Sequence, residues 1–247
     1  MPPNFSDVSP PTQIDFVDGP PKDTAAAPEP TSSQAALKVV RSVTTLATHM
    51  LIGIVVGSLL LATVRFMTPG ATKTHIILCV IGFQMLMAEG ILCLAPDSWC
   101  STLSLKHQRW VHTGLQLGGA VLALVGCFIK VVDTGVNFQT YHGQFALASM
   151  VFTTISLVNG CASLFAYELR KCIPSIVSRL THICFGTVAL ITASISLCFG
   201  MNYVWFVSFL SREYANALLV MVGALTTIVI INPLLTFYAK FSGAISS

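Results

Sequence analysis

Six long runs of apolar residues alternate with short polar segments along the chain. A hydrocarbon layer about 30 Å thick is crossed by roughly 20 helical residues, because an α-helix rises about 1.5 Å per residue. Each run reaches this length, so each predicts one membrane-spanning helix. The six spans are expected near residues 41–64, 74–95, 109–130, 141–167, 179–201 and 213–239.

The connections between the spans are short, which leaves no room for a sizeable soluble domain between them. Consecutive helices with short loops pack as antiparallel neighbours. The predicted fold class is therefore all-α, a six-helix transmembrane bundle in which spans two to five form a four-helix core. This membrane domain covers residues 38–240, and residues 241–247 are expected to be a short cytoplasmic tail.

Residues 1–37 have a different composition from the spans. They hold eight of the 12 prolines and five of the 10 acidic residues, with few large apolar side chains. Such a segment buries too little surface to offset the entropy that ordering costs. It is predicted to be a disordered cytoplasmic tail.

The overall composition supports a membrane protein. Apolar residues make up 54% of the chain and charged residues only 9%, whereas soluble domains carry about 25% charged residues. This balance excludes nucleic-acid binding and soluble catalysis as main functions. The eight cysteines form no CxxC pair, and most lie inside apolar runs, so they predict small core residues and no disulfide framework.

The positions of Lys and Arg near the span ends indicate the orientation, because short cytoplasmic loops are enriched in these residues. With a cytoplasmic N-terminus, eight of them lie inside and four outside, so both termini are expected in the cytoplasm. The inner set is Lys38, Arg41, Lys106, Arg109, Arg170, Lys171, Arg179 and Lys240; the outer set is Arg65, Lys73, Lys130 and Arg212.

Four histidines lie at two matched depths of the predicted bundle. His75 and His142 open the second and fourth spans from the outer side. His112 and His182 lie within about a turn of the inner ends of the third and fifth spans. In an up-down ring of four helices, each same-depth pair lies on one diagonal, so two facing pairs are expected.

Two imidazoles facing each other across a bundle suit a haem ligated on both axial faces. Two such haems, about 20 Å apart, would carry electrons across the membrane. Zinc or copper is the competing metal reading, although closed zinc sites use four ligands and each level offers two histidines. Two further alternatives stay open: histidines that only hydrogen-bond between helices, and a haem-free multi-pass carrier or membrane scaffold.

The residues around these histidines resemble the cytochrome b561 family, and within it the short domain-containing branch. The resemblance covers about residues 40–240 and is carried by residues 74–92, 106–127, 141–150 and 179–201. It implies six helices and two haem b groups, with His75 and His142 as axial iron ligands of the outer haem. It likewise implies His112 and His182 as ligands of the inner haem. The chain departs from the family at Ile76, where proline is usual, and at residues 140–144.

The same resemblance implies a transmembrane ascorbate-dependent oxidoreductase in an internal membrane, such as the endoplasmic reticulum or vesicles, or in the plasma membrane. Electrons would pass from cytoplasmic ascorbate to monodehydroascorbate or a ferric chelate on the other side, and a homodimer is compatible with the family. Lys106, Arg109 and Arg179 precede the inner histidines at helical spacing and could bind the ascorbate anion. Basic residues at inner helix ends also satisfy the positive-inside rule or bind lipid phosphate, and the two readings have equal weight.

Three further ionisable residues lie near the spans. His49 is expected near mid-membrane, with no histidine at the same depth, as a packed or hydrogen-bonded side chain. His107 is expected in water, and neither histidine is assigned to a haem. Glu89 is expected near the inner haem level, where it could exchange a proton, accept hydrogen bonds or be solvated.

Overall fold

The protein is seen in a computed structural model that describes residues 31–96, 98–165 and 174–246. The described part is built of helices, and six helical stretches are long and apolar enough to span a membrane. This confirms the predicted all-α fold and a multi-pass membrane protein. The helices are α1 (Ser32–Phe66), α2 (Ala71–Cys79), η1 (Val80–Met87), α3 (Ala88–Leu92), α4 (Leu105–Asp133), α5 (Tyr141–Leu164), α6 (Ser175–Met201), α7 (Val204–Leu210) and α8 (Arg212–Ile245).

The first and last helices extend beyond the predicted spans. Helix α1 begins at Ser32, so residues 32–37 of the predicted disordered tail are helical, and residues 1–30 lie outside the described part. The start is stabilised by the Gln34 side chain, whose Oε1 accepts a hydrogen bond from the Thr31 backbone N–H at 3.0 Å. Helix α8 continues to Ile245, so the short C-terminal tail is mostly helical.

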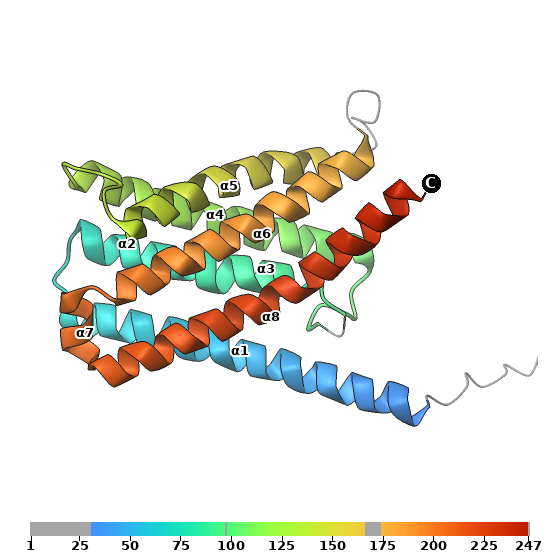
Figure 1. The fold of residues 1–247 in the computed structure, drawn as a ribbon, viewed down its shortest axis with the longest axis horizontal. Coiled ribbons are helices and arrows are strands. Elements are labelled where there is room, and N and C mark those ends of the chain that lie inside the picture. The colour runs from blue at the N-terminus through green and yellow to red at the C-terminus, as the bar shows by residue number, and fades with distance from the viewer. Residues whose placement is uncertain (1–30, 97, 166–173, 247) are drawn as a thin grey trace, which may run out of the picture.

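The second to fifth spans form a ring. The second span, built of α2, η1 and α3, packs against α4; α4 packs against α5, α5 against α6, and α6 against η1. Helices α1 and α8 lie outside this ring and pack against each other; α1 also packs against η1 and α2, and α8 against α6 and α3 (Figure 1). The ring is the up-down arrangement that the short loops predicted. The N-terminal end of α1 and the C-terminal end of α8 lie at the same end of the bundle (Figure 1).

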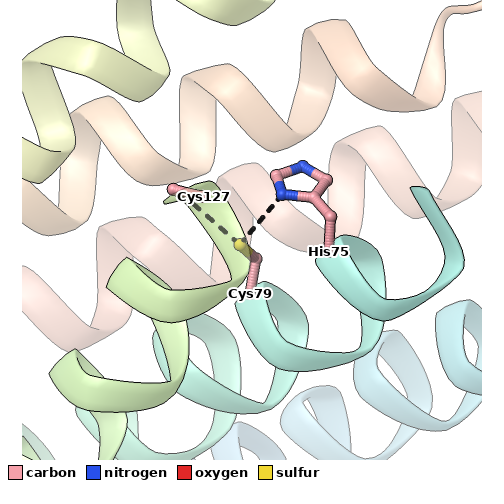
Figure 2. A group of neighbouring side chains, drawn as sticks. All are labelled: His75, Cys79 and Cys127. Atoms are coloured by element: carbon pink, nitrogen blue, oxygen red, sulfur yellow. Dashed lines mark hydrogen bonds between the residues drawn. The ribbon is translucent and has the colours of Figure 1, made fainter. Parts of the chain in front are cut away.

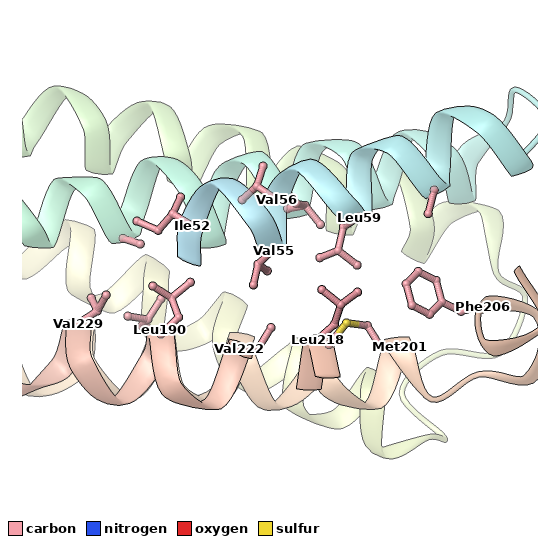
Figure 3. Close-up of a cluster of buried hydrophobic side chains, with 14 of the residues drawn as sticks. Ile52, Val55, Val56, Leu59, Leu190, Met201, Phe206, Leu218, Val222 and Val229 are labelled. Carbon is pink, nitrogen blue, oxygen red and sulfur yellow. The ribbon is translucent and has the colours of Figure 1, made fainter. Parts of the chain in front are cut away.

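A cluster of buried apolar side chains fills the space between α1, α6 and α8 (Figure 3). Val55 and Leu59 of α1 face Leu218 and Val222 of α8, and each of these side chains is at most 1% exposed. Lipid tails are as apolar as these side chains, so close packing stabilises this contact more than transfer from water does. The cluster fixes the two outer helices against the ring.

The second span and α4 approach most closely at two glycines. A Cβ atom on Gly82 would lie 2.6 Å from the carbonyl oxygen of Gly119, and one on Gly119 would lie 2.7 Å from Met87 Cγ. Neither position can hold a larger side chain without moving a helix. Such small residues let membrane helices pack backbone to backbone.

The middle of the second span is a π-helix, η1 (Val80–Met87). In a π-helix each N–H bonds to the carbonyl five residues earlier, so it absorbs an additional residue that an α-helix of the same length could not hold. Gln84 in this segment is buried and donates a hydrogen bond to Ser194 Oγ of α6 at 3.2 Å. The wider turn therefore changes which residues of the span face α4 and α6.

Candidate functional site

Two pairs of histidines face each other inside the four-helix ring. We call His75 and His142 the first histidine pair and His112 and His182 the second histidine pair. The ring centroids are 6.1 Å apart in the first pair and 6.0 Å in the second, with interplanar angles of 88° and 87°. The pairs join α2 to α5 and α4 to α6, which are the two diagonals of the ring.

All four imidazoles are held in the same way, by a backbone carbonyl on a neighbouring helix. Each Nδ1 lies at hydrogen-bond distance from one carbonyl oxygen, so Nδ1 carries the proton and Nε2 keeps a free lone pair. The partners are Gly126 for His75 (3.0 Å), Ser196 for His142 (2.8 Å), Gly90 for His112 (2.6 Å) and Ser156 for His182 (2.9 Å).

The histidines and these carbonyls recur at a fixed spacing. On α4, α5 and α6 the acceptor lies fourteen residues beyond the histidine, about 21 Å along the helix. On the second span the spacing is fifteen, from His75 to Gly90, and the π-helix η1 lies between them. Each span thus supplies a histidine at one level and a carbonyl at the other. The three fourteen-residue couples are His112 and Gly126, His142 and Ser156, and His182 and Ser196.

The separation within each pair fits an iron bound between two Nε2 atoms. A metal–imidazole bond is about 2 Å long, and the ring centre lies about 1 Å beyond the nitrogen. Two such ligands on opposite sides of a metal therefore have centroids about 6 Å apart. The measured separations of 6.1 and 6.0 Å match this value. The donor set, two neutral imidazoles, is also one that haem accepts.

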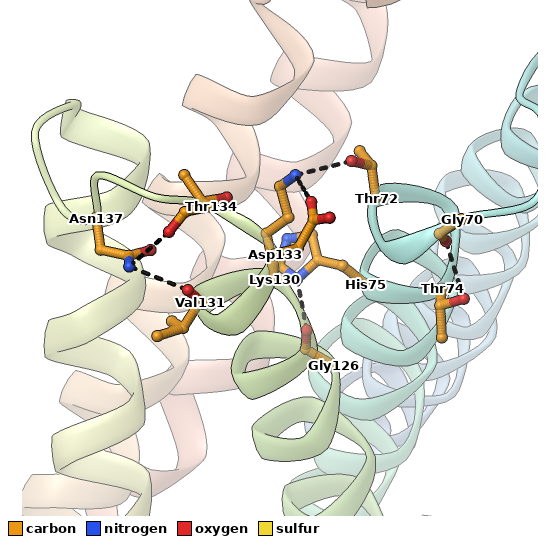
Figure 4. Close-up of polar contacts among 10 residues, drawn as sticks. All are labelled: Gly70, Thr72, Thr74, His75, Gly126, Lys130, Val131, Asp133, Thr134 and Asn137. Carbon is orange, nitrogen blue, oxygen red and sulfur yellow. Dashed lines mark hydrogen bonds and ion pairs between the residues drawn. The ribbon is translucent and has the colours of Figure 1, made fainter.

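A cavity of about 420 Å³ adjoins the first histidine pair, within the range of small-molecule and cofactor sites. Its walls are largely apolar, and its end is rimmed by polar side chains. Lys130 contributes an ammonium that donates to Thr72 Oγ1 at 2.9 Å and to Asp133 Oδ2 at 2.6 Å (Figure 4). Asn137 donates to the carbonyls of Val131 and Thr134 at 3.0 Å each. The sequence indicates a role for Lys130 in orientation only and does not reveal its place on this rim.

Two glycines leave room for the imidazoles of α5 and α6. A Cβ on Gly160 would lie 3.0 Å from His182 Cε1, and a Cβ on Gly200 would lie 3.2 Å from His142 Nδ1. A larger side chain at either position would push the imidazole from its place. Sequence reasoning missed both, because the contact joins residues 22 and 58 positions apart in the chain.

His75 also has two thiols beside it. Cys79 Sγ lies 3.5 Å from His75 Nδ1 and 3.6 Å from Cys127 Sγ (Figure 2). These atoms could hold a metal ion, but His75 Nδ1 already faces the Gly126 carbonyl, and a closed zinc site uses four ligands. The thiols are therefore better explained as packing beside His75, whereas Cys161 and Cys184, also predicted to be core residues, are exposed. The seven described cysteines are free thiols.

The three basic residues suggested for anion binding lie at the end of the second histidine pair. Lys106 lies in the first turn of α4, Arg109 and Arg179 lie in the second turns of α4 and α6, and all three are exposed. The N-terminal ends of both helices add partial positive charge there. Arg170 and Lys171, which contributed to the orientation count, lie outside the described residues.

Glu89 and His49 form a contact between α3 and α1. Glu89 Oε1 lies 2.7 Å from His49 Nδ1, and Glu89 Oε2 accepts a hydrogen bond from Trp99 Nε1 at 3.2 Å. Because Glu89 precedes Gly90, the carbonyl partner of His112, His49 lies near the second histidine pair. Through its contact with Glu89, His49 lies at the level of the second histidine pair, whereas the sequence predicted it at a depth of its own. His107 bonds locally to Ser104 Oγ.

Together, the six-helix bundle and the facing imidazoles define a membrane electron-transfer protein of the b-type cytochrome class. The family model for eukaryotic cytochrome b561 matches residues 74–207, more than half of the chain, so the chain belongs to the eukaryotic cytochrome b561 family.

Curated relatives place the chain more narrowly. It is 28% identical over 177 residues to the human protein named transmembrane reductase CYB561D2, covering 69% of this chain and 79% of the relative. The mouse and bovine proteins of the same name are 28% and 26% identical, with the same coverage. The family and branch expected from the residues are confirmed. Haem b binding and transmembrane electron transfer by an oxidoreductase follow, and the haem-free carrier or scaffold is set aside.

Proposed function

We propose that the chain passes electrons across the membrane through two b-type haems, one held by each histidine pair. The observation that carries this proposal is the spacing of about 6 Å between facing imidazoles whose Nδ1 atoms are already engaged. Each haem, when bound, supplies an iron that gains and loses one electron. The protein residues hold the haems and orient the imidazole ligands.

The carbonyl partners prepare the four histidines for this role. A hydrogen bond at Nδ1 fixes the tautomer, turns the Nε2 lone pair toward the partner ring and raises the basicity of the ligand. The two levels lie about 21 Å apart along the helices, so electrons cross most of the hydrocarbon layer inside the protein. The apolar side chains around the ring exclude water from this route.

The electron donor in this proposal is cytoplasmic ascorbate, and the acceptor is monodehydroascorbate or a ferric chelate on the opposite side. Ascorbate is an anion at neutral pH, and Lys106, Arg109 and Arg179 give the end of the second histidine pair a positive charge. The described ends of α1 and α8 lie at this same end (Figure 1). With the positive-inside rule, these observations favour a cytoplasmic location for both termini and for the second pair.

The purified protein in detergent tests the haem assignment. Wild-type protein is expected to bind two haems per chain and to develop reduced b-type absorption bands on adding ascorbate. His142→Leu is expected to lose one haem and keep the other, because the second histidine pair lies at the other level. Haem content by pyridine haemochrome and absorption spectra measure this. A His142→Leu protein that still binds two haems would contradict the ligand assignment.

Electron transfer across the membrane is tested in sealed vesicles. Proteoliposomes loaded with ascorbate and placed in ferric chelate or monodehydroascorbate are expected to reduce the external acceptor, and protein-free vesicles are not. His142→Leu is the matched control, since it should accept electrons at the inner level and fail to pass them on. Equal rates for wild-type and His142→Leu vesicles would exclude a path through both levels.

A further inference from the structure

The contact between Glu89 and His49 lies next to the second histidine pair without being part of it. Glu89 precedes Gly90, and the Gly90 carbonyl accepts the 2.6 Å hydrogen bond from His112 Nδ1. Glu89 and the residue whose carbonyl orients the imidazole are therefore neighbours in the chain, although the Glu89 carboxylate itself faces His49 and Trp99. A charge near a redox centre changes its potential, by more where the surroundings exclude water, and Glu89 lies at the level of His112.

The Glu89 carboxylate makes two polar contacts inside the membrane domain. Glu89 Oε1 contacts His49 Nδ1 of α1 at 2.7 Å, and Oε2 accepts from Trp99 Nε1 in the loop after α3 at 3.2 Å. The side chains of His49 and Glu89 are 29% and 21% exposed. An ionisable group inside a span is costly unless it is paired, and such pairs often mark proton or ion pathways in membrane proteins.

The two side chains can share one titrating proton. With neutral His49, Nδ1–H donates to the Glu89 carboxylate and the pair carries one negative charge. With one further proton on the pair, the imidazolium and carboxylate together are neutral. The geometry is the same in both states, because Nδ1 remains the donor at 2.7 Å.

On this basis we propose that the Glu89–His49 pair takes up a proton when the cofactor held by His112 and His182 gains an electron. This inference rests on the proposed function. Ascorbate monoanion releases one electron and one proton as it becomes the monodehydroascorbate radical anion. The electron goes to the haem iron at this level and the proton to the pair, so the charge added by one is cancelled by the other. Glu89 and His49 act through the His112 site and do not touch the reacting atoms.

Other ionisable groups lie close to α3 and on the helices packed against it. Burial raises the pKa of the Cys93 thiol to about 12 and also raises the pKa of the Cys100 thiol, so both stay protonated near neutral pH. Helices α4 and α8 and segment η1 pack against α3. The π-helix η1 carries no ionisable side chain. The ionisable groups at this end are Lys38 and Arg41 on α1, Lys106, His107, Arg109 and His112 on α4, Arg179 and His182 on α6, and Tyr238 and Lys240 on α8.

The measurement is the midpoint potential of the haem between His112 and His182 as a function of pH. Reduction favours the protonated pair, so the pair binds its proton more tightly in the reduced protein. Between the two protonation steps the potential should therefore fall as pH rises, by up to about 59 mV per pH unit, the value for a tenfold change in a one-electron couple. Spectroelectrochemical titration of the holoprotein between pH 5 and 9 gives this slope for each haem.

Glu89→Gln keeps a hydrogen-bonding side chain and removes the charge. It is expected to raise the potential of this haem and to flatten its pH dependence, while the other haem keeps its behaviour. His49→Gln leaves Glu89 and Trp99 in contact, so it provides a second test if Glu89→Gln does not fold; the pH range of the slope should shift. Trp99→Phe, which changes no ionisable group, should keep the slope.

Two matched controls separate the pair from general effects of charge. Glu213→Gln removes a carboxylate from the far end of α8, and His107→Gln removes a histidine that bonds only to Ser104. Both should behave as wild type. A flat wild-type slope with two ascorbate-reducible haems, or an unchanged slope in both Glu89→Gln and His49→Gln, would overturn the inference and leave the proposed function intact. A protein without haem would overturn both.

Discussion

At the scale of single residues, the orientation of the four histidines depends on the carbonyls and glycines around each imidazole. Each imidazole has a carbonyl partner on a neighbouring helix, and two of them also have a glycine against the ring. These supports fix the orientation of a ligand to within the narrow limits that metal sites need. A change that leaves every histidine in place can therefore still disturb a site.

Gly160→Ala tests this at the second histidine pair. The new Cβ would lie 3.0 Å from His182 Cε1, so the imidazole must move, at a cost of about 1–3 kcal/mol for overpacking. We expect a lower thermal midpoint and a shifted spectrum or partial loss of one haem. Gly223→Ala is the control, because nothing lies within 4 Å of its Cβ position. Identical spectra and stability for both variants would show that the ring has free space at Gly160.

The sequence identified the histidines and their pairing by depth, because a polar side chain in an apolar run is conspicuous. It could not identify Gly126, Gly90, Ser156 and Ser196 as their partners. Every residue has a carbonyl, and which of them faces an imidazole depends on how two helices are rotated against each other. The Glu89–His49 contact cannot be read from the sequence for the same reason, although the distance of Glu89 from His75 along the helix does predict a position near His112.

At the scale of the helices, the spans were predictable because length and hydropathy alone set them. Their ends were not, since α1 and α8 continue past the apolar runs into polar residues that a helix tolerates in water. The π-helix η1 was also invisible to a 3.6-residue period. It explains why His75 and Gly90 are fifteen residues apart while the other three couples are fourteen apart.

Gly119→Val tests the close crossing between the second span and α4. A Cβ at Gly119 already lies 2.7 Å from Met87 Cγ, and a branched side chain would force the two helices apart. We expect a loss of about 1–3 kcal/mol in stability, seen as a lower thermal midpoint in detergent. Gly57→Val on α1, where the Cβ position is open, should have little effect. Similar midpoints for the two variants would mean that the crossing adapts easily.

At the scale of the whole molecule, charge is distributed unevenly between the two ends of the bundle. Positive side chains concentrate at the end that holds the second histidine pair, and the first pair lies beside a cavity with a polar rim. Basic side chains at this end would result either from selection for membrane orientation or from binding of an anionic substrate, and sequence and geometry favour both equally. The dependence of the reduction rate on ascorbate concentration distinguishes the two roles.

The triple variant Lys106→Ala, Arg109→Ala, Arg179→Ala is expected to raise the KM for ascorbate about tenfold. This estimate assumes about 0.5 kcal/mol for each exposed charge. The steady-state rate of haem reduction against ascorbate concentration measures it, and absorption spectra check that both haems are bound. Lys240→Ala, another cation at this end, is the control. An unchanged KM in the triple variant would assign these residues to membrane orientation alone.

Each span carries a histidine at one level and an acceptor carbonyl at the other, so movement of one helix affects both levels. A small rotation or translation of α5 would tilt the imidazole of His142. It would also move the Ser156 carbonyl oxygen, which accepts the hydrogen bond from His182 at the other level. The geometry of one histidine pair therefore cannot change through movement of one helix without a response at the other pair. Distant substitutions, lipid thickness or partner binding should therefore change the two centres together, as a coupled set.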